Sequence, residues 1–505
     1  MMKSWVLLGF WVLVVIISVG YWRWRKYSSK RMKKKEKQQG EINSHGDDGG
    51  GTIPKGSSGW PFIGETLDFI SCGYTSRPVS FMDKRVPLYG KVFKSHLLGR
   101  PIIVSTDPDV NKVVLQNING NTFVPYYPKS ITELFGKSSI LQMNGILQRR
   151  VHGLIGGFLK SLQLKARITK EIENFVDLTM NTWTNNRTIY IQEETKNITF
   201  PVLVRVLMSV NPGKDMEFLR KEFGEFIKGL VCLPIKLPGT RLYKSLKAKE
   251  RLMKMVKEVL EKKKMKMETN RDEDEGFVVA DAADALLLDS GESNDMQRLP
   301  LDFIKGNLIE MMIPGEDSVP MVMTLAVKYL SHNQLALQQL KEENMELKKQ
   351  KANLGEDYVW TDYMSLPFTQ NVISETLRMA NIINGVWRKA LKDVQIKGYL
   401  IPKGWCVLAS FSSVHMDEEN YDNPYEFDPW RWQQQNKQGR SGNCFTPFGG
   451  GHRLCPGLEF SRLEIAIFLH HLVTRFRWVI DEEDYIVNFP TVKMRRKLPI
   501  TVTPL

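Results

Sequence analysis

Ten residues near the C-terminal end constrain the fold of this chain more than any other feature. They read FGGGHRLCPG and run from Phe448 to Gly457. Consecutive glycines permit a tight turn and let the backbone approach a flat group closely. Cys455 follows this turn and directly precedes a helical pattern, and the free N–H groups at a helix N-terminus stabilise a thiolate. An isolated cysteine is usually a small core residue, but these surroundings predict a thiolate that binds a metal.

Cysteine usage in the rest of the chain agrees with a single chemical cysteine. Among 505 residues there are five cysteines, and no two of them form a CxxC pair. Their small number and wide spacing argue against a disulfide framework, a zinc cage and an iron–sulfur cluster. With 42% hydrophobic and 25% charged residues, the chain has the composition of a globular protein. We therefore expect a large folded body in which one cysteine carries chemistry.

The ten-residue segment resembles the haem-binding signature of the cytochrome P-450 superfamily, Phe-x-x-Gly-x-Arg-x-Cys-x-Gly, and matches each fixed position. The resemblance implies heme b (iron protoporphyrin IX) with Cys455 as the metal ligand, and a thiolate ligand favours O–O cleavage in that family. Phe448 would pack beside the sulfur, while Gly449 and Gly457 would belong to the same cofactor-binding loop. Arg453 would meet a haem propionate through charge-assisted hydrogen bonds.

Two further segments resemble parts of the same family. Glu375 and Arg378 form its Glu-x-x-Arg motif, and this spacing puts both side chains on one helical face. Taken alone, the pair is equally typical of a surface salt bridge. Downstream, FDPWRW (427–432) resembles the segment whose arginine, here Arg431, completes a buried Glu–Arg–Arg network. Because a buried arginine needs paired partners, we interpret the three residues as structural.

The resemblance also implies further partners for the haem propionates. Arg388, in GVWRKA, lies where the family often places one. Another basic residue is expected within GILQRRVH (145–152), where the family often has Trp-x-x-x-Arg or His-Lys-x-x-Arg. This chain departs from both patterns. His152, Arg149 and Arg150 therefore all stay open as the second contact.

The segment PGEDS, from Pro314 to Ser318, resembles the family's Ala/Gly-Gly-x-Asp/Glu-Thr, which lies in a long helix across the haem. Delivery of protons to bound oxygen needs an acid and a hydroxyl. The resemblance implies that Asp317 and Ser318 are these catalytic residues. The chain departs from the family pattern twice, because proline replaces the small first residue and serine replaces threonine.

Two prolines are expected to disturb this helix. Pro314 has no N–H to donate to the carbonyl of Glu310, and Pro320 has none for the carbonyl of Glu316. We therefore predict a helix that is kinked on both sides of the acid–hydroxyl pair. A helix that ends near Pro314 is the alternative, but apolar sequence continues over residues 322–330 and favours the kinked helix.

The remaining sequence is dominated by helical patterns. We predict a basic helix over Lys244–Met267 with a solvated charged face, another helix from near Leu301, and a last one over Leu458–Trp478. Between residues 394 and 406, short alternating runs broken by Gly and Pro predict hairpins. The fold class is therefore mainly α with a smaller β part, and the resemblance implies the cytochrome P-450 fold.

The N-terminal end predicts a membrane anchor. Residues 5–22 carry no charge, which is just long enough to cross a bilayer. Nine Lys/Arg and a single Glu follow between Arg23 and Lys37, so this stretch supplies +8 of the net charge of +14. A cleaved signal peptide is the alternative, but its positive charge would stand in front of the apolar run. By the positive-inside rule, the rest of the chain faces the cytosol.

This arrangement divides the chain into three parts. We predict a transmembrane anchor at residues 1–22, a basic stretch and polar linker at 23–52, and a haem-binding catalytic domain at 53–505. We expect a single-pass protein of the endoplasmic reticulum membrane. Because most of the basic charge lies beside the apolar run, we expect it to meet membrane lipid, and we expect no nucleic-acid partner.

Longer stretches narrow the resemblance. GWPFIGET, MMIPGEDSVP and FTQNVISETLRM, among others, are similar to plant P-450s of brassinosteroid biosynthesis, and nearest to the steroid side-chain hydroxylases that act at carbon 23. The resemblance implies a monooxygenase that uses O2 and NADPH-derived electrons from NADPH–cytochrome P-450 reductase. The family's substrate pocket maps onto mostly apolar residues here: Met312, Ile313, Gly315, Ile383, Val386 and Val492.

Several alternatives stay open at this point. An apolar lining does not by itself choose a steroid over a terpenoid or a fatty acid, and carbon 22 is the alternative to carbon 23. The chain could also be a reductase-independent haem-thiolate isomerase or dehydratase, or a haem-binding sensor without catalysis. Dependence of turnover on NADPH and a reductase separates the monooxygenase from both.

Overall fold

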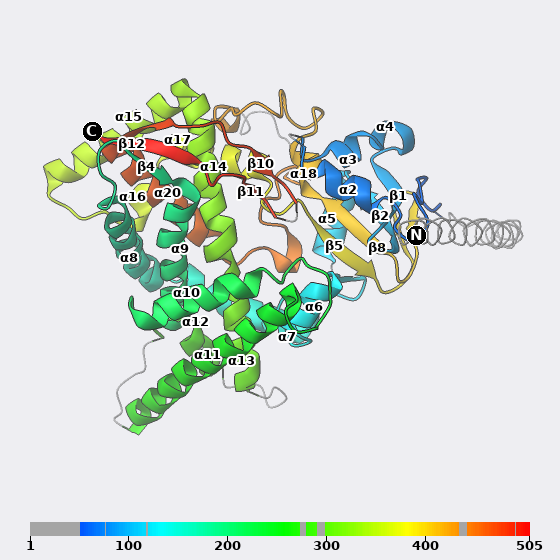
Figure 1. Cartoon of the computed structure of the whole chain (residues 1–505), viewed down its shortest axis with the longest axis horizontal. Coiled ribbons are helices and arrows are strands. Elements are labelled where there is room, and N and C mark those ends of the chain that lie inside the picture. The colour runs from blue at the N-terminus through cyan, green and yellow to red at the C-terminus, as the bar shows by residue number, and fades with distance from the viewer. Residues whose placement is uncertain are drawn as a thin grey trace, which may run out of the picture.

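Helices and strands separate into two regions. The computed structural model describes residues 51–75, 77–117, 120–272, 279–289, 298–433, 442–489 and 491–505. Within them, helices form one large body and the largest sheet lies in a smaller region beside it (Figure 1). The predicted class, mainly α with a smaller β part, is confirmed.

A five-stranded sheet in the order β1–β2–β8–β5–β3 forms most of the smaller region. Its strands are β1 (Val92–Leu97), β2 (Arg100–Ser105), β8 (Cys406–Ser410), β5 (Gly385–Ala390) and β3 (Phe123–Pro125). Strands β2 and β8 run parallel, and the other neighbours run antiparallel. All residues of β8 are buried, because Val407 and Ala409 pack into one hydrophobic cluster while Cys406 and Leu408 pack into another on the opposite face.

Short helices lie around this sheet. They are α2 (Thr66–Cys72), α3 (Ser80–Asp83), α4 (Val86–Tyr89), α5 (Pro108–Gln116) and α18 (Phe411–His415). Helix α5 begins as its sequence dictates. The Asp107 side chain accepts hydrogen bonds from the N–H groups of Asp109 and Val110, and Pro108 fills the first helical position.

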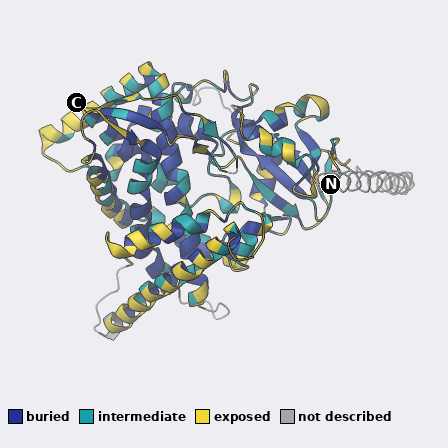
Figure 2. Cartoon of the chain, viewed as in Figure 1, coloured by how far each residue is buried: buried dark blue, intermediate teal, exposed yellow. Residues whose placement is uncertain are grey.

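The helical body is built around α14 (Val319–His332). Its residues from Val319 to Val327 are all buried, as expected for a helix that is apolar on every side. Four helices pack against it: α9 (Ile191–Met208), α15 (Gln334–Leu354), α17 (Pro367–Ala380) and α20 (Leu458–Arg475). Figure 2 shows the buried residues concentrated in this body and in the sheet.

The other helices of the body are shorter or more peripheral. They are α6 (Lys129–Phe135), α7 (Ile146–Lys160), α8 (Leu162–Met180), α10 (Lys214–Ile227), α12 (Ala282–Leu287), α13 (Leu301–Met311) and α16 (Trp360–Met364). Helix α13 begins where the sequence predicted, at Leu301.

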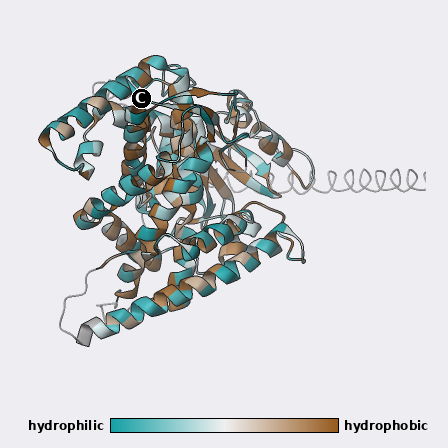
Figure 3. Cartoon of the chain, turned by 60° about the vertical axis from the view of Figure 1, so that its left-hand side comes forward, coloured by the Kyte–Doolittle hydropathy of each residue, from teal (hydrophilic) through white to brown (hydrophobic). Residues whose placement is uncertain are grey.

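The predicted basic helix is α11, which is longer than expected and runs over Arg241–Asp272. Buried residues recur along it every three or four positions, among them Leu252, Val256 and Leu260. Lys254 and Lys257, between these three residues, lie toward solvent, and Figure 3 shows hydrophilic and hydrophobic residues alternating along the helix. Its charge run is therefore the solvated face of an amphipathic helix.

Three small sheets complete the fold. One has the order β4 (Arg187–Tyr190), β12 (Pro499–Pro504), β9 (Phe476–Ile480). The others pair β10 (Ile486–Val487) with β11 (Lys493–Met494), and β6 (Val394–Ile396) with β7 (Tyr399–Ile401). The last pair confirms the hairpin expected between residues 394 and 406. Its two turn residues, Lys397 and Gly398, both have positive φ, as a tight hairpin turn requires.

The last helix is shorter than predicted. It was expected to reach Trp478 but ends at Arg475, because FRWVI, rich in aromatic and β-branched residues, pairs as β9 with β12.

The predicted transmembrane helix at 1–22 lies outside the described residues. In the part of the chain that the structure describes, no helix combines the length and apolar character needed to cross a bilayer.

Candidate active site

The segment Phe448–Gly457 forms a compact loop directly before α20. Gly449 and Gly451 adopt positive φ values of 73° and 64°, which side chains rarely tolerate. At Gly451 an added Cβ would lie 2.3 Å from the carbonyl oxygen of Leu115 in α5. The loop therefore needs glycine both for its turn and for its close approach to α5.

The loop closes on Cys455. Its N–H donates to the carbonyl of Phe448 at 3.1 Å, so both ends of the turn are joined at the cysteine. Burial raises the pKa of the Cys455 thiol, while a hydrogen bond from the N–H of Gly457 lowers it by less. A thiol in this position keeps its proton until a cation binds the sulfur. A Cβ at Gly457 would approach the sulfur to 3.9 Å, so glycine leaves space beside it.

Two arginines lie at this loop: Arg453, half-buried within it, and Arg388 of β5, which is buried. Arg453 donates to the carbonyls of Leu141, at 3.4 Å, and Met143. Burial, with the nearby charge of Arg388, lowers the pKa of Arg453 to about 10. Burial also lowers the pKa of Arg388, whose guanidinium donates to the carbonyl of Trp387 at 3.1 Å.

Arg388 and Arg453 together form a positively charged site that suits an anionic ligand. Among the described residues, no acidic side chain forms an ion pair with Arg388 or Arg453. Buried charges are normally paired, so this pair fits a ligand with carboxylates of its own. Tyr127, which the sequence analysis did not single out, lies beside both arginines, and burial raises its pKa. A thiol before a helix, close glycines and two arginines without an acidic partner in the described part of the chain together fit a haem with its propionates.

The three basic residues left open on α7 have different surroundings. Arg150 forms an ion pair with Asp289 at 2.6 Å. The Nε2 atom of His152 lies 2.7 Å from the carbonyl of Leu454, in the cysteine loop. Arg149 lies near His452, whose pKa is lowered by burial and further by the charges of Arg453, Arg149 and Arg388. This grouping favours Arg149 as the additional propionate partner.

The structure brings Glu375, Arg378 and Arg431 into one buried network. Arg378 donates twice to the Glu375 carboxylate, at 2.9 and 2.7 Å, and Arg431 donates to it at 2.9 Å. A fourth donor, the indole N–H of Trp432, lies 3.0 Å from the carboxylate. Both side chains of the Glu375–Arg378 pair are completely buried. The carboxylate is therefore saturated with donors, which is what stabilises a buried ion-pair network.

His415 links this network to the cysteine loop, and sequence reasoning missed it. Arg378 donates to the carbonyl of His415 at 2.8 Å. The Nε2 atom of the buried imidazole accepts from the N–H of Thr446 at 3.0 Å, and Nδ1 lies 3.1 Å from the side-chain oxygen of Asn381. Burial lowers the pKa of His415 to about 3, so the ring is neutral and remains an acceptor. A histidine before an acidic loop carries no sequence signal for this role.

The segment in which two kinks were predicted contains a π-helix. Helix α13 ends at Met311, a π-helix spans Pro314–Ser318, and α14 begins at Val319. The π-helix thus begins at Pro314 and ends two residues before Pro320, the two prolines predicted to disturb the helix. Asp317 and Ser318 both lie in it. Burial raises the pKa of Asp317, and the neighbouring Glu316 adds to this, whereas Lys196 opposes it.

The residues predicted to line a substrate pocket do not share one environment. Ile383 is 51% exposed although the chain around it is folded, and Ile313 and Val386 are half-buried. Val492 is buried in the main core. Met312 is completely buried in a helical cluster, and an added Cβ at Gly315 would meet Leu203 of α9 at 2.9 Å. Met312 and Gly315 thus pack against helical neighbours, and the substrate-pocket role of these six residues stays a prediction.

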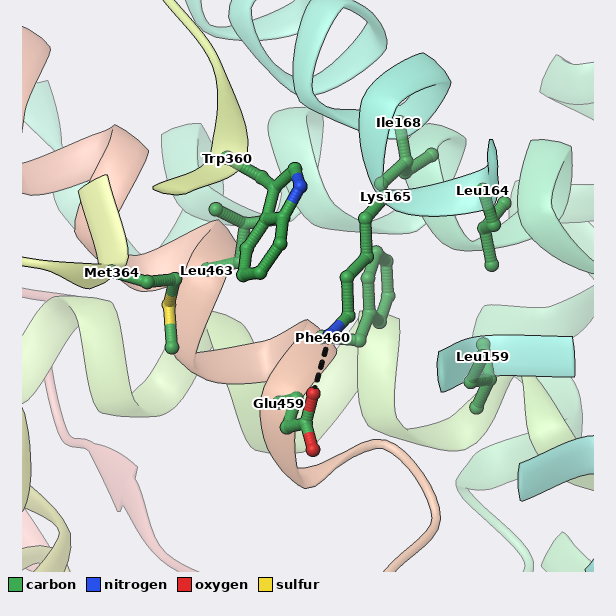
Figure 4. A pocket seen from close by; sticks show the side chains of 9 residues that line it. All are labelled: Leu159, Leu164, Lys165, Ile168, Trp360, Met364, Glu459, Phe460 and Leu463. Atoms are coloured by element: carbon green, nitrogen blue, oxygen red, sulfur yellow. Dashed lines mark hydrogen bonds and ion pairs between the residues drawn. The ribbon is translucent and has the colours of Figure 1, made fainter. Parts of the chain in front are cut away.

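One pocket near α20 is unrelated to substrate. It has a volume of about 20 Å³ and lies between α8, α16 and α20. Figure 4 shows Lys165 and Glu459 joined by an ion pair of 2.6 Å, with the indole of Trp360 beside the lysine. Such a space admits about one water molecule and cannot accept a steroid.

Comparisons with known proteins agree with this geometry. The Cytochrome P450 family model matches residues 54–502. The chain is 62% identical over 494 residues to the 3-epi-6-deoxocathasterone 23-monooxygenase CYP90C1 of Arabidopsis thaliana, covering 98% of this chain and 92% of that protein. It is 53% identical to the 3-epi-6-deoxocathasterone 23-monooxygenase CYP90D1 of the same plant, over 90% of each chain.

A solved structure shares the fold. The retinoic acid-bound cyanobacterial CYP120A1 superposes with a TM-score of 0.78 at 23% identity, covering 90% of this chain and all of that one. At this identity the likeness concerns the fold alone. The family match over most of the sequence and the two plant relatives show that the chain belongs to the cytochrome P450 family.

Proposed function

We propose that this protein is a haem-thiolate monooxygenase that hydroxylates the side chain of a brassinosteroid precursor at carbon 23. The identity of 62% to a 3-epi-6-deoxocathasterone 23-monooxygenase over almost the whole chain carries this proposal. A second relative with the same printed activity supports it at 53%. The reaction would consume O2 and NADPH-derived electrons, delivered by NADPH–cytochrome P-450 reductase.

The residues around the loop would hold the haem. Cys455 would ligate the iron through its sulfur, with the Gly457 N–H donating to that sulfur. Arg388, Arg453 and Arg149 would meet the propionates, since their cluster lacks acidic partners among the described residues. When bound, the haem activates O2 for insertion into an unactivated C–H bond.

The π-helix would supply the protons. Asp317 has its pKa raised by burial, which brings its titration closer to neutral pH and suits an acid that donates and recovers protons. The hydroxyl of Ser318 would pass a proton or orient the oxygen, in the place where the family has threonine. Lys196, paired with Glu316 at 3.0 Å, keeps a positive charge close to both acids.

The substrate assignment is tested by titration and turnover. The purified protein is mixed with 3-epi-6-deoxocathasterone, a diterpene and a fatty acid, and the shift of the ferric spectrum to the high-spin form is recorded. Each compound is then incubated with NADPH and the reductase, and the products are identified. We expect only the steroid to shift the spectrum and to gain a hydroxyl at carbon 23.

Other results would redirect the proposal. Hydroxylation at carbon 22 would keep the steroid and change the position. Turnover of the diterpene or the fatty acid alone would contradict the steroid assignment. Conversion of the steroid without NADPH or reductase would indicate a haem-thiolate isomerase.

We also propose that residues 1–22 anchor the protein in the endoplasmic reticulum membrane, with 23–52 as linker and 53–505 as the catalytic domain on the cytosolic side. The uncharged run and the basic stretch behind it support this. So does the start of the described chain, where Trp60 and Phe62 are 79% and 78% exposed, because such residues suit a membrane interface. Deletion of residues 1–37 should weaken membrane attachment and keep haem. Loss of haem on deletion would show that the segment belongs to the fold.

A further inference from the structure

In π-helical register, Pro320 removes the helical donor of the Gly315 carbonyl. In this stretch the N–H of Val319 donates to the carbonyl of Pro314, five residues earlier. The next N–H in the same register would come from residue 320 and reach the carbonyl of Gly315. Residue 320 is proline, which has no N–H. In the α-helical register expected from the sequence, the same proline would instead leave the carbonyl of Glu316 without a donor.

Helix α9 supplies the missing donor. The hydroxyl of Thr199, a completely buried side chain, lies 2.6 Å from the carbonyl oxygen of Gly315. The same hydroxyl also lies 3.0 Å from the carbonyl of Thr195 in its own helix. A hydroxyl has one proton to donate. The carbonyl of Thr195 is inside α9, where the N–H of Thr199 is its helical donor, so the shorter contact to Gly315 receives the proton.

Helix α9 also contacts the π-helix at Glu316 and the first turn of α14 at Pro320. Lys196 pairs with Glu316 at 3.0 Å, and the hydroxyl of Thr195 lies 3.2 Å from the carbonyl of Pro320. At Gly315 an added Cβ would lie 3.1 Å from the carbonyl oxygen of Thr199. Helix α9 and the π-helix thus pack closely at Gly315, where a side chain would force its neighbours to shift.

We infer that Thr199 is a positioning residue for oxygen activation, which rests on the proposed monooxygenase function. If the Thr199 hydroxyl is removed, the carbonyl of Gly315 can recover a donor in only one way within the helix. The N–H of Val319 would move from Pro314 to Gly315, four residues earlier, which is α-helical register. That change removes the wide turn and rotates Asp317 and Ser318 about the helix axis. Thr199 therefore holds the catalytic pair in place without touching the reacting atoms.

The test compares Thr199→Val, which removes the hydroxyl at nearly constant volume, with Thr199→Ser, which keeps it. Thr169→Val is the matched control, because Thr169 is buried in α8 and its hydroxyl donates to the carbonyl of Lys165 at 2.8 Å. Native enzyme and variants receive reductase, NADPH and 3-epi-6-deoxocathasterone. Haem content, the reduced carbon-monoxide band, the spin shift, NADPH oxidation, product and hydrogen peroxide are measured.

We expect Thr199→Val to keep the band and the spin shift but to form at least about tenfold less product per NADPH, in line with the loss of a proton-delivery group. The electrons should appear in hydrogen peroxide, formed from O2, two protons and two electrons. Thr199→Ser and Thr169→Val should match the native ratio. A Thr199→Val enzyme with native product per NADPH would overturn the inference.

A second variant keeps the test decisive if Thr199→Val is unstable. Pro320→Ala restores an N–H that can reach the carbonyl of Gly315 in π-helical register. The double variant Thr199→Val with Pro320→Ala should therefore recover both haem content and product per NADPH. A double variant that recovers neither would also overturn the inference. If the native enzyme itself forms no hydroxylated steroid, the proposed function fails, and this is seen before any variant is compared.

Discussion

At the scale of single residues, the environment of a cysteine decides whether it can ligate a metal. Cys455 lies in a glycine loop, receives an N–H from Gly457 and precedes α20. Cys444, only eleven positions earlier, has its sulfur 3.4 Å from the side-chain oxygen of Asn420 and no helix behind it. The two cysteines are the same residue type and differ in what surrounds the sulfur.

Replacement of Cys455 by serine should abolish the thiolate-type absorption of the reduced carbon-monoxide complex. An oxygen ligand donates less electron density to iron than a thiolate. Absorption spectra of Cys455→Ser and Cys444→Ser, recorded side by side, check this, with the second variant keeping the native band. Retention of the band in Cys455→Ser and its loss in Cys444→Ser would reverse the ligand assignment.

Asp317→Asn should slow product formation by roughly a hundred- to ten-thousand-fold, because an amide cannot deliver a proton. The spin shift on substrate binding should be preserved. Rates from single-turnover mixing and the titration separate the two effects. Asp302→Asn is the control, since Asp302 lies on the adjoining α13 with its side chain 85% exposed. Equal rates in native enzyme and Asp317→Asn would remove Asp317 from the mechanism.

At the scale of elements, the Glu375 network holds three segments together. It joins α17 to the segment with Arg431 and Trp432, and through the carbonyl of His415 to the end of α18. From there His415 accepts the N–H of Thr446, two residues before the cysteine loop. The geometry of the loop thus depends on elements that are distant in sequence.

Glu375→Gln should lower the free energy of unfolding by about 3–5 kcal/mol, because it removes the buried countercharge that Arg378 and Arg431 share. Haem content should fall as well. Denaturant unfolding of the purified holoenzyme measures the first effect. Asp357→Ala breaks an exposed pair with Lys170, whose side chains are 82% and 65% exposed, and should cost less than about 1 kcal/mol. Similar losses in the two variants would mean that burial of the network adds nothing.

At the scale of the whole molecule, buried histidines make stability depend on pH. Burial lowers the pKa of His415 and His470 to about 3 and that of His471 to about 4. The unfolded chain binds these protons near pH 6.5, whereas the folded chain does not. The free energy that the neutral imidazoles contribute to folding is therefore fully present above about pH 6.5. It is lost as the pH falls toward the pKa values of the folded state.

His470→Asn should flatten this decline by up to about 1.4 kcal/mol per pH unit between pH 6 and 4. An asparagine does not titrate and can still approach Asn344, whose side-chain oxygen lies 3.0 Å from the imidazole. Thermal unfolding over this pH range gives the slopes. Parallel curves for His470→Asn and the native enzyme would refute the linkage.

The sequence by itself determined the features that a short stretch of chain can encode. The loop around Cys455, the Glu-x-x-Arg spacing, the disturbed helix at Pro314 and the amphipathic α11 each follow from local backbone demands or from helical periodicity. For the same reason the class, mainly α with a smaller β part, could be predicted before any tertiary contact was known.

Only the tertiary structure decided which of these stretches meet. It set the π-helical register at Gly315, whose carbonyl receives the Thr199 hydroxyl of α9, and it paired Arg150 with Asp289, whereas Arg149 lies near His452. It buried Met312 in a helical cluster, and it joined His415 to the N–H of Thr446, two residues before the cysteine loop. These roles arise from contacts between segments far apart in the chain, where the burial and geometry of a partner, and not the residue type, determine what a side chain does.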